Sequence, residues 1–151
     1  MTLTRLLEFL DGNGVKYVII RHSMAYTALE VAESAHIQGR ELAKTVILNL
    51  DGKLAMAVVP ASRKVVLDLV AKSTGAQSVQ LATEQEFAHM FPGCAVGAMP
   101  PFGNLYGMEV FADPRLAEDQ EIAFNAGSHT ELIRMTHRDY ERLVKPRHFP
   151  M

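Results

Sequence analysis

Two apolar segments joined by a tight turn, between residues 45 and 60, constrain the fold of this chain more than any other feature. Thr45 to Leu50 contains three consecutive apolar residues, and a run that is apolar on both faces is typical of a strand buried in a sheet. Asp51-Gly52 then favours a hairpin turn, and the apolar segment LAMAVVP returns until Pro60 stops it. The stretch therefore predicts a β-hairpin whose first strand is buried.

Helix and strand patterns alternate along the rest of the chain. Helices are predicted after the capping residues Thr2 or Thr4, Thr27, Ser62, Thr83 and Thr136. Further strands are predicted at Lys16 to Arg21, Ser78 to Leu81, Met108 to Ala112, Glu121 to Asn125 and Thr130 to Met135. This alternation predicts an α/β fold, with one compact domain over residues 1–151 and a mixed, barrel-like β-sheet surrounded by helices.

Composition excludes several classes of protein. The 151 residues are 48% apolar and 21% charged, and the formal net charge of −2 argues against a strongly basic protein that coats nucleic acid, without excluding a local basic face. The single Cys94 rules out an intrachain disulfide framework and fits a reducing cytosol. No apolar run is long enough to span a membrane, and the N-terminal residues, with Glu8 and Asp11, predict a helix rather than a signal peptide. We therefore expect a cytoplasmic protein.

The segment VGAMPPFG, from Val96 to Gly103, is the most unusual in composition. Glycine lets a backbone approach a ligand closely, and proline stiffens the same loop by fixing φ. A loop that is both bare and rigid suits preorganised N–H donors for a developing oxyanion. The alternative is a connecting loop that is simply rich in turn-forming residues.

A second segment, from Asn125 to Thr130, ends one predicted strand and begins the next. His129 at this junction would position a polar substrate group or act as a general base, or it would be a histidine on a surface turn. Nothing in the local sequence identifies a base for Cys94, and the six histidines form no HxH or HExxH pair. We therefore expect neither thiol catalysis nor a metal site.

Two groups of cations are candidates for binding an anion. Lys44 stands at the mouth of the buried strand, where it either extends into water or points into a pocket. Near the C-terminus, Arg134, Arg138, Arg142 and Lys145 would fall on nearly one face of a helix. Such a face can contact nucleic-acid phosphates, or it can be an ordinary solvated surface.

Together these segments resemble the YbaK/prolyl-tRNA synthetase-associated domain family of aminoacyl-tRNA editing proteins. The resemblance rests on His22 after the strand YVII, on Lys44-Thr45 opening TVILNL, on MAVVP followed by RKVVLDLVAK, on VGAMPPFG and on NAGSHTELIRM. It extends over nearly the whole chain, from about Leu3 to Val144. Each segment is weak alone, but their order and spacing are specific.

The resemblance implies hydrolysis of the ester that joins a wrong amino acid to the 3′-terminal adenosine of a tRNA. It implies that Lys44 points inward as a cation required for deacylation. The backbone of Gly97 would donate to the scissile carbonyl, and a ribose hydroxyl of the substrate would activate the water. The expected substrate contacts are His22, Thr45, Pro101, Phe102, Gly103, Gly127, Ser128 and His129, and the expected tRNA contacts are Arg134, Arg138 and Arg142.

The resemblance also implies the partners. These are the aminoacylated 3′ end of a tRNA and, where one is required, an aminoacyl-tRNA synthetase. No cofactor, metal, DNA or membrane is expected.

One departure from the family pattern bears on the substrate. The final pocket segment reads Gly127-Ser128-His129-Thr130, where the cysteine-deacylating branch has an arginine-containing motif. This favours alanine, serine or threonine over cysteine, on tRNA(Pro) or a related tRNA. Two alternatives stay open at this point: a non-catalytic module that binds tRNA or a synthetase, and an esterase of a small metabolite that needs no phosphate track.

Overall fold

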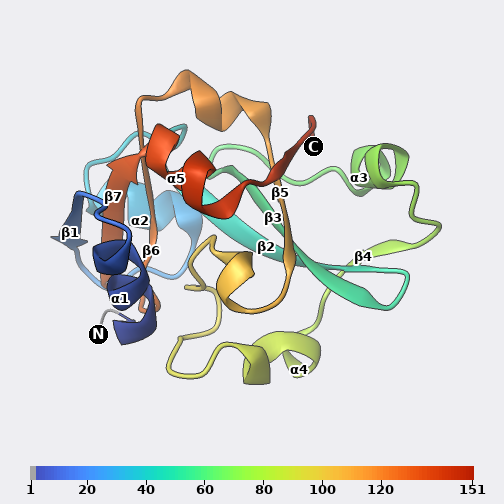
Figure 1. The fold of residues 1–151 in the computed structure, drawn as a ribbon, viewed down its shortest axis with the longest axis horizontal. Coiled ribbons are helices and arrows are strands. Elements are labelled where there is room, and N and C mark those ends of the chain that lie inside the picture. Colours follow the sequence, from blue (N-terminus) through green and yellow to red (C-terminus); the bar gives the residue numbers. More distant parts are fainter. Residues whose placement is uncertain (1–2) are drawn as a thin grey trace.

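The computed structural model of the protein describes residues 3–151, and its strands form two sheets (Figure 1). The first sheet is antiparallel, in the order β1–β7–β6, and consists of β1 (Tyr17–Arg21), β7 (Glu131–Thr136) and β6 (Glu121–Asn125). The second is mixed, in the order β4–β2–β3–β5–β8, with β3 parallel to β5 and β5 parallel to β8. Its strands are β4 (Val79–Leu81), β2 (Ala43–Leu50), β3 (Lys53–Pro60), β5 (Glu109–Ala112) and β8 (Arg147–His148).

The hairpin predicted from the two apolar segments is confirmed. β2 and β3 pair antiparallel along their whole lengths, and Asp51 and Gly52 have positive φ angles of 51° and 91°, as a two-residue hairpin turn requires. The other predicted strands are confirmed, whereas β8 was not predicted. The mixed sheet is also confirmed. Over residues 3–151, however, the strands do not close into a barrel, because two separate sheets meet at a parallel bridge between Leu42 and Ala123.

Threonine capping places three of the helix starts. The side chains of Thr27, Thr83 and Thr136 each accept a hydrogen bond from a backbone N–H of the first helical turn, as predicted. They begin α2 (Ala28–Ser34), α4 (Glu84–Phe87) and α5 (His137–Val144). Short 3₁₀ helices lie at Ala88–Met90, Gly103–Leu105 and Pro114–Glu118.

Two predicted caps are wrong, and the predicted Thr2 lies outside the described residues. Thr4 is the first residue of α1 (Thr4–Gly12) rather than its cap, and the preceding Leu3 makes no side-chain cap. Ser62 does not begin α3 (Leu67–Thr74), because the Val66 N–H donates to the Met151 carbonyl at 2.7 Å. After β3 the chain therefore makes a turn at Ala61 and Ser62, and the helix starts only after Val66.

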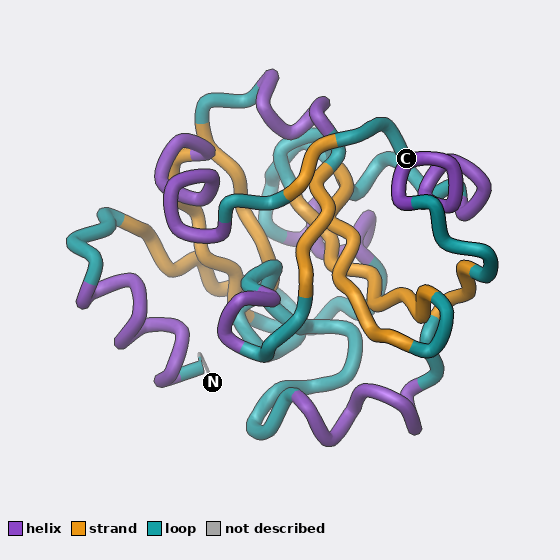
Figure 2. Tube along the Cα trace, turned by 45° about the vertical axis from the view of Figure 1, so that its right-hand side comes forward, coloured by secondary structure: helices purple, strands orange, loops and turns teal. Residues whose placement is uncertain are grey.

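The helices lie on the outside of the two sheets (Figure 2). The largest apolar cluster joins Leu6 of α1 to both sheets, and two smaller clusters pack Val31 of α2 and Val70 of α3. β6 stops and β7 starts at the same end of the first sheet. This packing leaves that end close to the beginning of β2.

Candidate active site

The candidate site lies at an uncovered edge of β2. On the side away from β3, β4 pairs only with Leu48, Asn49 and Leu50, and the Ala82 N–H donates to the Ile47 carbonyl at 2.9 Å. The N–H and C=O groups of a strand alternate in direction from one residue to the next, so those of Thr45 point to the same side as those of Ile47. At Thr45 this side lies beyond the end of β4. Lys44 and Thr45, both predicted site residues, are adjacent in β2. Their side chains therefore point to opposite faces of the sheet.

Lys44 is half-buried and lines a hollow of about 330 Å³. Burial lowers the pKa of Lys44 below its ordinary value, and the positive charge of Lys64 lowers it further. No carboxylate of residues 3–151 forms an ion pair with Lys44. The other lining residues are Thr27, Ala28, Leu29, Ala61, Ser62, Arg63 and Lys64. A cation in this setting is suited to hold an anion.

The Thr45 side chain lines a second cavity, of about 240 Å³. This cavity is mostly apolar, with walls from β2, from the residues after β4, and from Phe87, Val96, Gly97 and Met99. The Oγ1 atom of Thr45 is buried and, within the described residues, has no hydrogen-bond partner. Leaving a buried polar group unpaired costs about 1–3 kcal/mol, so a ligand hydroxyl at this position would be stabilised.

Gly97 lies in the wall of this Thr45 cavity. Its φ of +89° is a conformation that glycine adopts at little cost. The neighbouring amides of Ala95 and Ala98 donate to backbone carbonyls, whereas the Gly97 N–H donates to the thioether Sδ of Met99 at 3.2 Å. Sulfur is a weak acceptor, so a carbonyl oxygen or an oxyanion can displace it.

The second half of the same loop lies in the core. Pro101, Phe102 and Gly103 are buried, and the Tyr140 hydroxyl donates to the Pro101 carbonyl at 2.7 Å. A Cβ atom added at Gly103 would lie 2.6 Å from the Val110 side chain. This placement does not fit the substrate contacts predicted for Pro101, Phe102 and Gly103, which instead anchor the loop that carries Gly97.

The two segments predicted separately from the sequence pack against each other. The Gly127 N–H donates to the Ala98 carbonyl at 2.9 Å, and the Ala95 N–H donates to the Gly127 carbonyl at 2.8 Å. Gly127 has a φ of +99°, and a Cβ atom there would lie 2.5 Å from Leu3. Gly127 therefore fixes the position of the loop from behind, and the next residue, the half-buried Ser128, follows it towards β7.

His129 supports the Gly97 loop with one ring nitrogen and leaves the other unpaired. Its Nε2 lies 3.0 Å from the Val96 carbonyl, and its ring lies 4.9 Å from that of Tyr26. Because a carbonyl only accepts, Nε2 carries the hydrogen and Nδ1 is an acceptor. This Nδ1 is buried and has no partner among residues 3–151.

His22 has the same arrangement at the neighbouring position of the sheet. Its Nδ1–H donates to the Ser23 carbonyl at 2.7 Å, and its backbone N–H donates to the Thr130 carbonyl at 2.9 Å. Its Nε2 is buried and unpaired within the described part of the chain. Two unpaired histidine acceptors thus lie at the end of the sheet where β7 begins.

The basic helix face predicted near the C-terminus is not formed. Arg134 lies on β7, and Lys145 is the left-handed residue that ends α5, with a φ of 52°. Arg138 and Arg142 alone lie on the helix. The prediction failed because it carried a helical period across the boundary between a strand and a helix.

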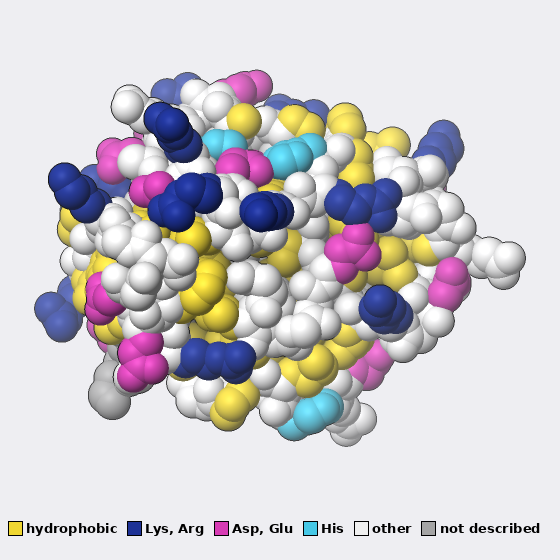
Figure 3. All heavy atoms as spheres, in the orientation of Figure 1, with side chains coloured by type: hydrophobic (Ala, Val, Ile, Leu, Met, Phe, Trp, Pro, Cys, Tyr) yellow, Lys and Arg dark blue, Asp and Glu magenta, His cyan; other side chains and the backbone are white. Residues whose placement is uncertain are grey.

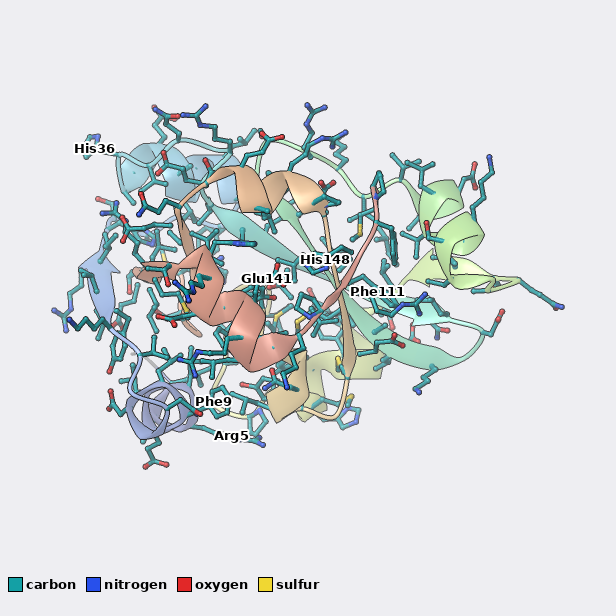
Figure 4. The ribbon with its side chains drawn as sticks, turned by 45° about the horizontal axis from the view of Figure 1, so that its top comes forward. Arg5, Phe9, His36, Phe111, Glu141 and His148 are labelled. Atoms are coloured by element: carbon teal, nitrogen blue, oxygen red, sulfur yellow. The ribbon has the colours of Figure 1, made fainter. Side chains whose placement is uncertain are left out.

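The polar side chains of α5 pair mostly among themselves. Arg142 lies 3.2 Å from Asp139, and Figure 4 shows Glu141 and His148 side by side, with 2.7 Å between Oε1 and Nε2. His137 also contacts Glu141, at 3.0 Å. Basic, acidic and histidine side chains are interleaved on the face that α5 crosses (Figure 3). α5 starts at the end of β7 remote from His129, roughly 20 Å away at about 3.3 Å per residue.

The remaining candidates offer no alternative chemistry. Burial raises the pKa of the Cys94 thiol to about 11, so the thiolate is scarce at neutral pH. Within residues 3–151, no group of three His, Cys, Asp or Glu side chains could hold a metal ion. No helix in that range is long and apolar enough to cross a membrane.

Sequence reasoning missed Tyr26, Arg63 and Lys64. A signal for the two cations was present, because Lys44 pairs with Val59 across the predicted hairpin. The residues that follow β3 must then lie beside those that begin β2. Tyr26 gave no such signal, since its contact with the His129 ring depends on packing between distant segments.

Comparisons with known proteins identify the family of this chain. The family model described as aminoacyl-tRNA editing domain matches residues 22–143. The Escherichia coli (strain K12) protein "Multifunctional Ser/Thr-tRNA deacylase ProXp-y" is 29% identical over 97% of this chain and 90% of its own length.

Solved structures have the same fold. A candidate trans-editing enzyme for prolyl-tRNA synthetase superposes with a TM-score of 0.81 at 21% identity, over 97% of this chain and 93% of its own. A hypothetical protein superposes with a TM-score of 0.86 at 18% identity, over 97% of both chains.

Proposed function

We propose that this chain, which belongs to the aminoacyl-tRNA editing domain family and is an aminoacyl-tRNA deacylase, acts in trans and removes serine or threonine from mischarged tRNA at the uncovered edge of β2. One observation carries this assignment. Lys44, Thr45 and Gly97 lie around a single exposed stretch of strand, and His129 holds the Gly97 loop.

The amino-acid side chain is proposed to enter the Thr45 cavity. The walls are mostly apolar and the volume is about 240 Å³, which suits a small side chain. The unpaired Thr45 Oγ1 is both a donor and an acceptor, so it can bond a substrate hydroxyl. This favours serine and threonine over alanine, and cysteine, with its weak thiol donor, follows behind. The name of the E. coli relative points the same way.

The reaction is the addition of water to the ester carbonyl. A ribose hydroxyl of the terminal adenosine takes the proton of the attacking water, and the carbon–oxygen bond to the ribose then breaks. The ribose hydroxyl passes a proton on to the departing ribose oxygen, which gives free amino acid and deacylated tRNA. The Gly97 N–H, released from Met99, donates to the carbonyl oxygen as negative charge develops on it.

Lys44 is proposed to hold the terminal nucleotide as a cation. Burial and Lys64 both lower its pKa, so a bound phosphate would stabilise its charged form. His129 is proposed to set the shape of the pocket through Val96 and Tyr26 rather than to transfer the proton. His22, Gly127 and Ser128 would support this arrangement from the neighbouring strands.

The carrier is proposed to be tRNA(Pro) or a related tRNA, with Arg134, Arg138 and Arg142 contacting its body. A synthetase is the second proposed partner. The resemblance to a candidate trans-editing enzyme for prolyl-tRNA synthetase supports both.

Incubation with tRNAs carrying serine, threonine, alanine, cysteine or proline, followed by measurement of ester loss, tests the function. Seryl- and threonyl-tRNA should be hydrolysed fastest, and prolyl-tRNA should be spared. Thr45→Val, which keeps the shape but removes the hydroxyl, should reduce the preference for serine over alanine by about tenfold. An unchanged preference would remove Thr45 from substrate selection.

Hydrolysis of no aminoacyl-tRNA, with tRNA binding retained, would favour a non-catalytic module. Hydrolysis of simple esters without a requirement for RNA would favour a small-molecule esterase.

A further inference from the structure

A pair of adjacent cations, Arg63 and Lys64, stands beside the site without a role in the chemistry proposed above. Both are exposed, and both line the hollow that Lys44 faces. Lys64 is close enough to Lys44 to lower its pKa. These three cations are called the mouth cluster below.

The backbone holds the mouth cluster in place on both sides. The Ala61 N–H donates to the Leu42 carbonyl at 2.7 Å, and the Arg63 N–H donates to the Pro60 carbonyl at 2.9 Å. Further on, the Val66 N–H donates to the Met151 carbonyl at 2.7 Å. The two side chains therefore extend from a fixed turn rather than from a free loop.

The charge of the mouth cluster is uncompensated. Within residues 3–151, no ion pair involves Lys44, Arg63 or Lys64. Other arginines of the protein are paired with carboxylates, as Arg40, Arg115, Arg142 and Arg147 are. Three mutually repelling cations around one hollow are stabilised when an anion enters it.

Apolar side chains stand next to these charges. Leu29 lines the same hollow as the cations and is 60% exposed, and Tyr26, which is 67% exposed, directly precedes Thr27, another residue that lines the hollow. Exposed flat or apolar side chains beside a basic groove are the combination that binds single-stranded nucleic acid, because bases stack while phosphates pair with Lys and Arg.

We propose that Arg63 and Lys64, together with Lys44, bind the phosphodiester groups of the single-stranded 3′ end of the tRNA. This inference rests on the proposed function, because the hollow adjoins the edge at which the ester would be cleaved. Lys44 contacts the terminal nucleotide, and Arg63 and Lys64 contact the phosphates that precede it. The mouth cluster thus guides the 3′ end along the turn after β3 into the site.

The test measures binding of uncharged tRNA at several salt concentrations by the Arg63→Ala/Lys64→Ala double variant. Loss of two contacts to a single strand should lower the slope of log affinity against log salt by about 1.4 and weaken binding roughly tenfold at low salt. Arg63→Lys/Lys64→Arg, which keeps both charges, should retain the slope. The matched control is Lys53→Ala/Lys72→Ala, which removes two exposed cations outside the hollow and should leave the slope unchanged.

A second substrate locates the contact. On tRNA trimmed of its single-stranded 3′ end, the double variant and the wild-type protein should bind alike. A double variant that matches the Lys53/Lys72 control overturns the proposal, and so does a defect that persists on the trimmed tRNA. Binding of uncharged tRNA does not depend on hydrolysis, so failure of the proposed deacylation is read separately, from ester loss by the wild-type protein.

Discussion

The polar side chains at the two ends of β7 differ in whether they have hydrogen-bond or ion-pair partners. Where β7 begins, the acceptors of His22 and His129 and the nearby hydroxyl of Thr45 are buried without partners in the described chain. Where β7 ends, α5 follows, and its Asp139 and Glu141 are both paired. Buried polar groups in proteins are normally satisfied, so unpaired ones concentrated in one place indicate a surface prepared for a ligand.

The cations of the two ends differ in the same way. The mouth cluster has no carboxylate partner within residues 3–151, whereas Arg142 on α5 is paired with Asp139. The number of cations in the sequence favours α5 as the surface that binds an anion. The absence of carboxylate partners among the described residues favours the mouth cluster instead. The difference teaches that a basic patch is better judged by which of its charges are left uncompensated than by how many there are.

The largest effect is expected from Lys44→Ala. Removing the cation proposed to hold the terminal nucleotide should lower single-turnover deacylation by about 10³-fold. The thermal midpoint should stay close to that of the wild type, because the lowered pKa of Lys44 shows that its charge is not stabilised by the fold. Near-normal turnover by a folded Lys44→Ala protein would show that the cation near the start of β7 is no more important for deacylation than the paired Arg142 on α5.

A smaller but still large effect is expected from Gly97→Val. Gly97 has a φ of +89°, and a side chain there would meet His129 Cε1 at 3.5 Å and obstruct the N–H donor. Deacylation at saturating substrate should fall by about 10²-fold, with tRNA affinity largely kept.

Gly52→Val is the matched control for Gly97→Val. Gly52 has a φ of +91° at the hairpin tip, and a Cβ atom added there would have no neighbour within 4 Å among the described residues. A valine at Gly52 would therefore strain the backbone in the same way without touching the candidate site. Similar loss of stability in both variants, with activity lost only in Gly97→Val, is expected. Intact turnover in Gly97→Val would make the loop a mere connection.

An intermediate effect is expected from His129→Ala. Since its ring supports Val96 and packs on Tyr26, its loss should change the ranking of amino acids by about tenfold while hydrolysis continues. The panel of mischarged tRNAs measures this ranking. An equal, large loss on every substrate would assign His129 to catalysis, and no change would assign it to an ordinary turn.

The smallest effect is expected at the other end of the molecule, from Arg138→Ala/Arg142→Ala. Arg142 already has a partner and both side chains are exposed, so tRNA affinity should weaken only about twofold, equally for all tRNAs and less at high salt. Filter binding beside the Arg63→Ala/Lys64→Ala variant gives the comparison directly. If Arg138→Ala/Arg142→Ala weakens tRNA binding more than Arg63→Ala/Lys64→Ala does, α5 rather than the mouth cluster is the main tRNA contact.

Local features of this fold could be predicted from the sequence, because they depend on neighbouring residues. The hairpin at Asp51-Gly52 and the caps at Thr27, Thr83 and Thr136 were each set by hydrogen bonds within a few positions. The family resemblance likewise depended on local segments, and it anticipated the reaction class.

The parts that could not be predicted depend on distant contacts. Ser62 failed as a cap because Met151 takes the N–H of Val66, and composition could not tell that Phe102 faces Tyr140 while Gly97 faces the cavity. The mouth cluster, by contrast, was missed although it could have been predicted, because the predicted hairpin places the residues that follow β3 beside those that begin β2.

The most direct test of this account is an NMR titration with a seryl-adenosine analogue in which a stable amide replaces the ester. The backbone amide signals of Thr45 and Gly97 should shift, since both residues line the cavity at the uncovered edge of β2, while those of Arg138 and Arg142 should stay in place. Shifts confined to α5, with Thr45 and Gly97 unmoved at saturation, would contradict it.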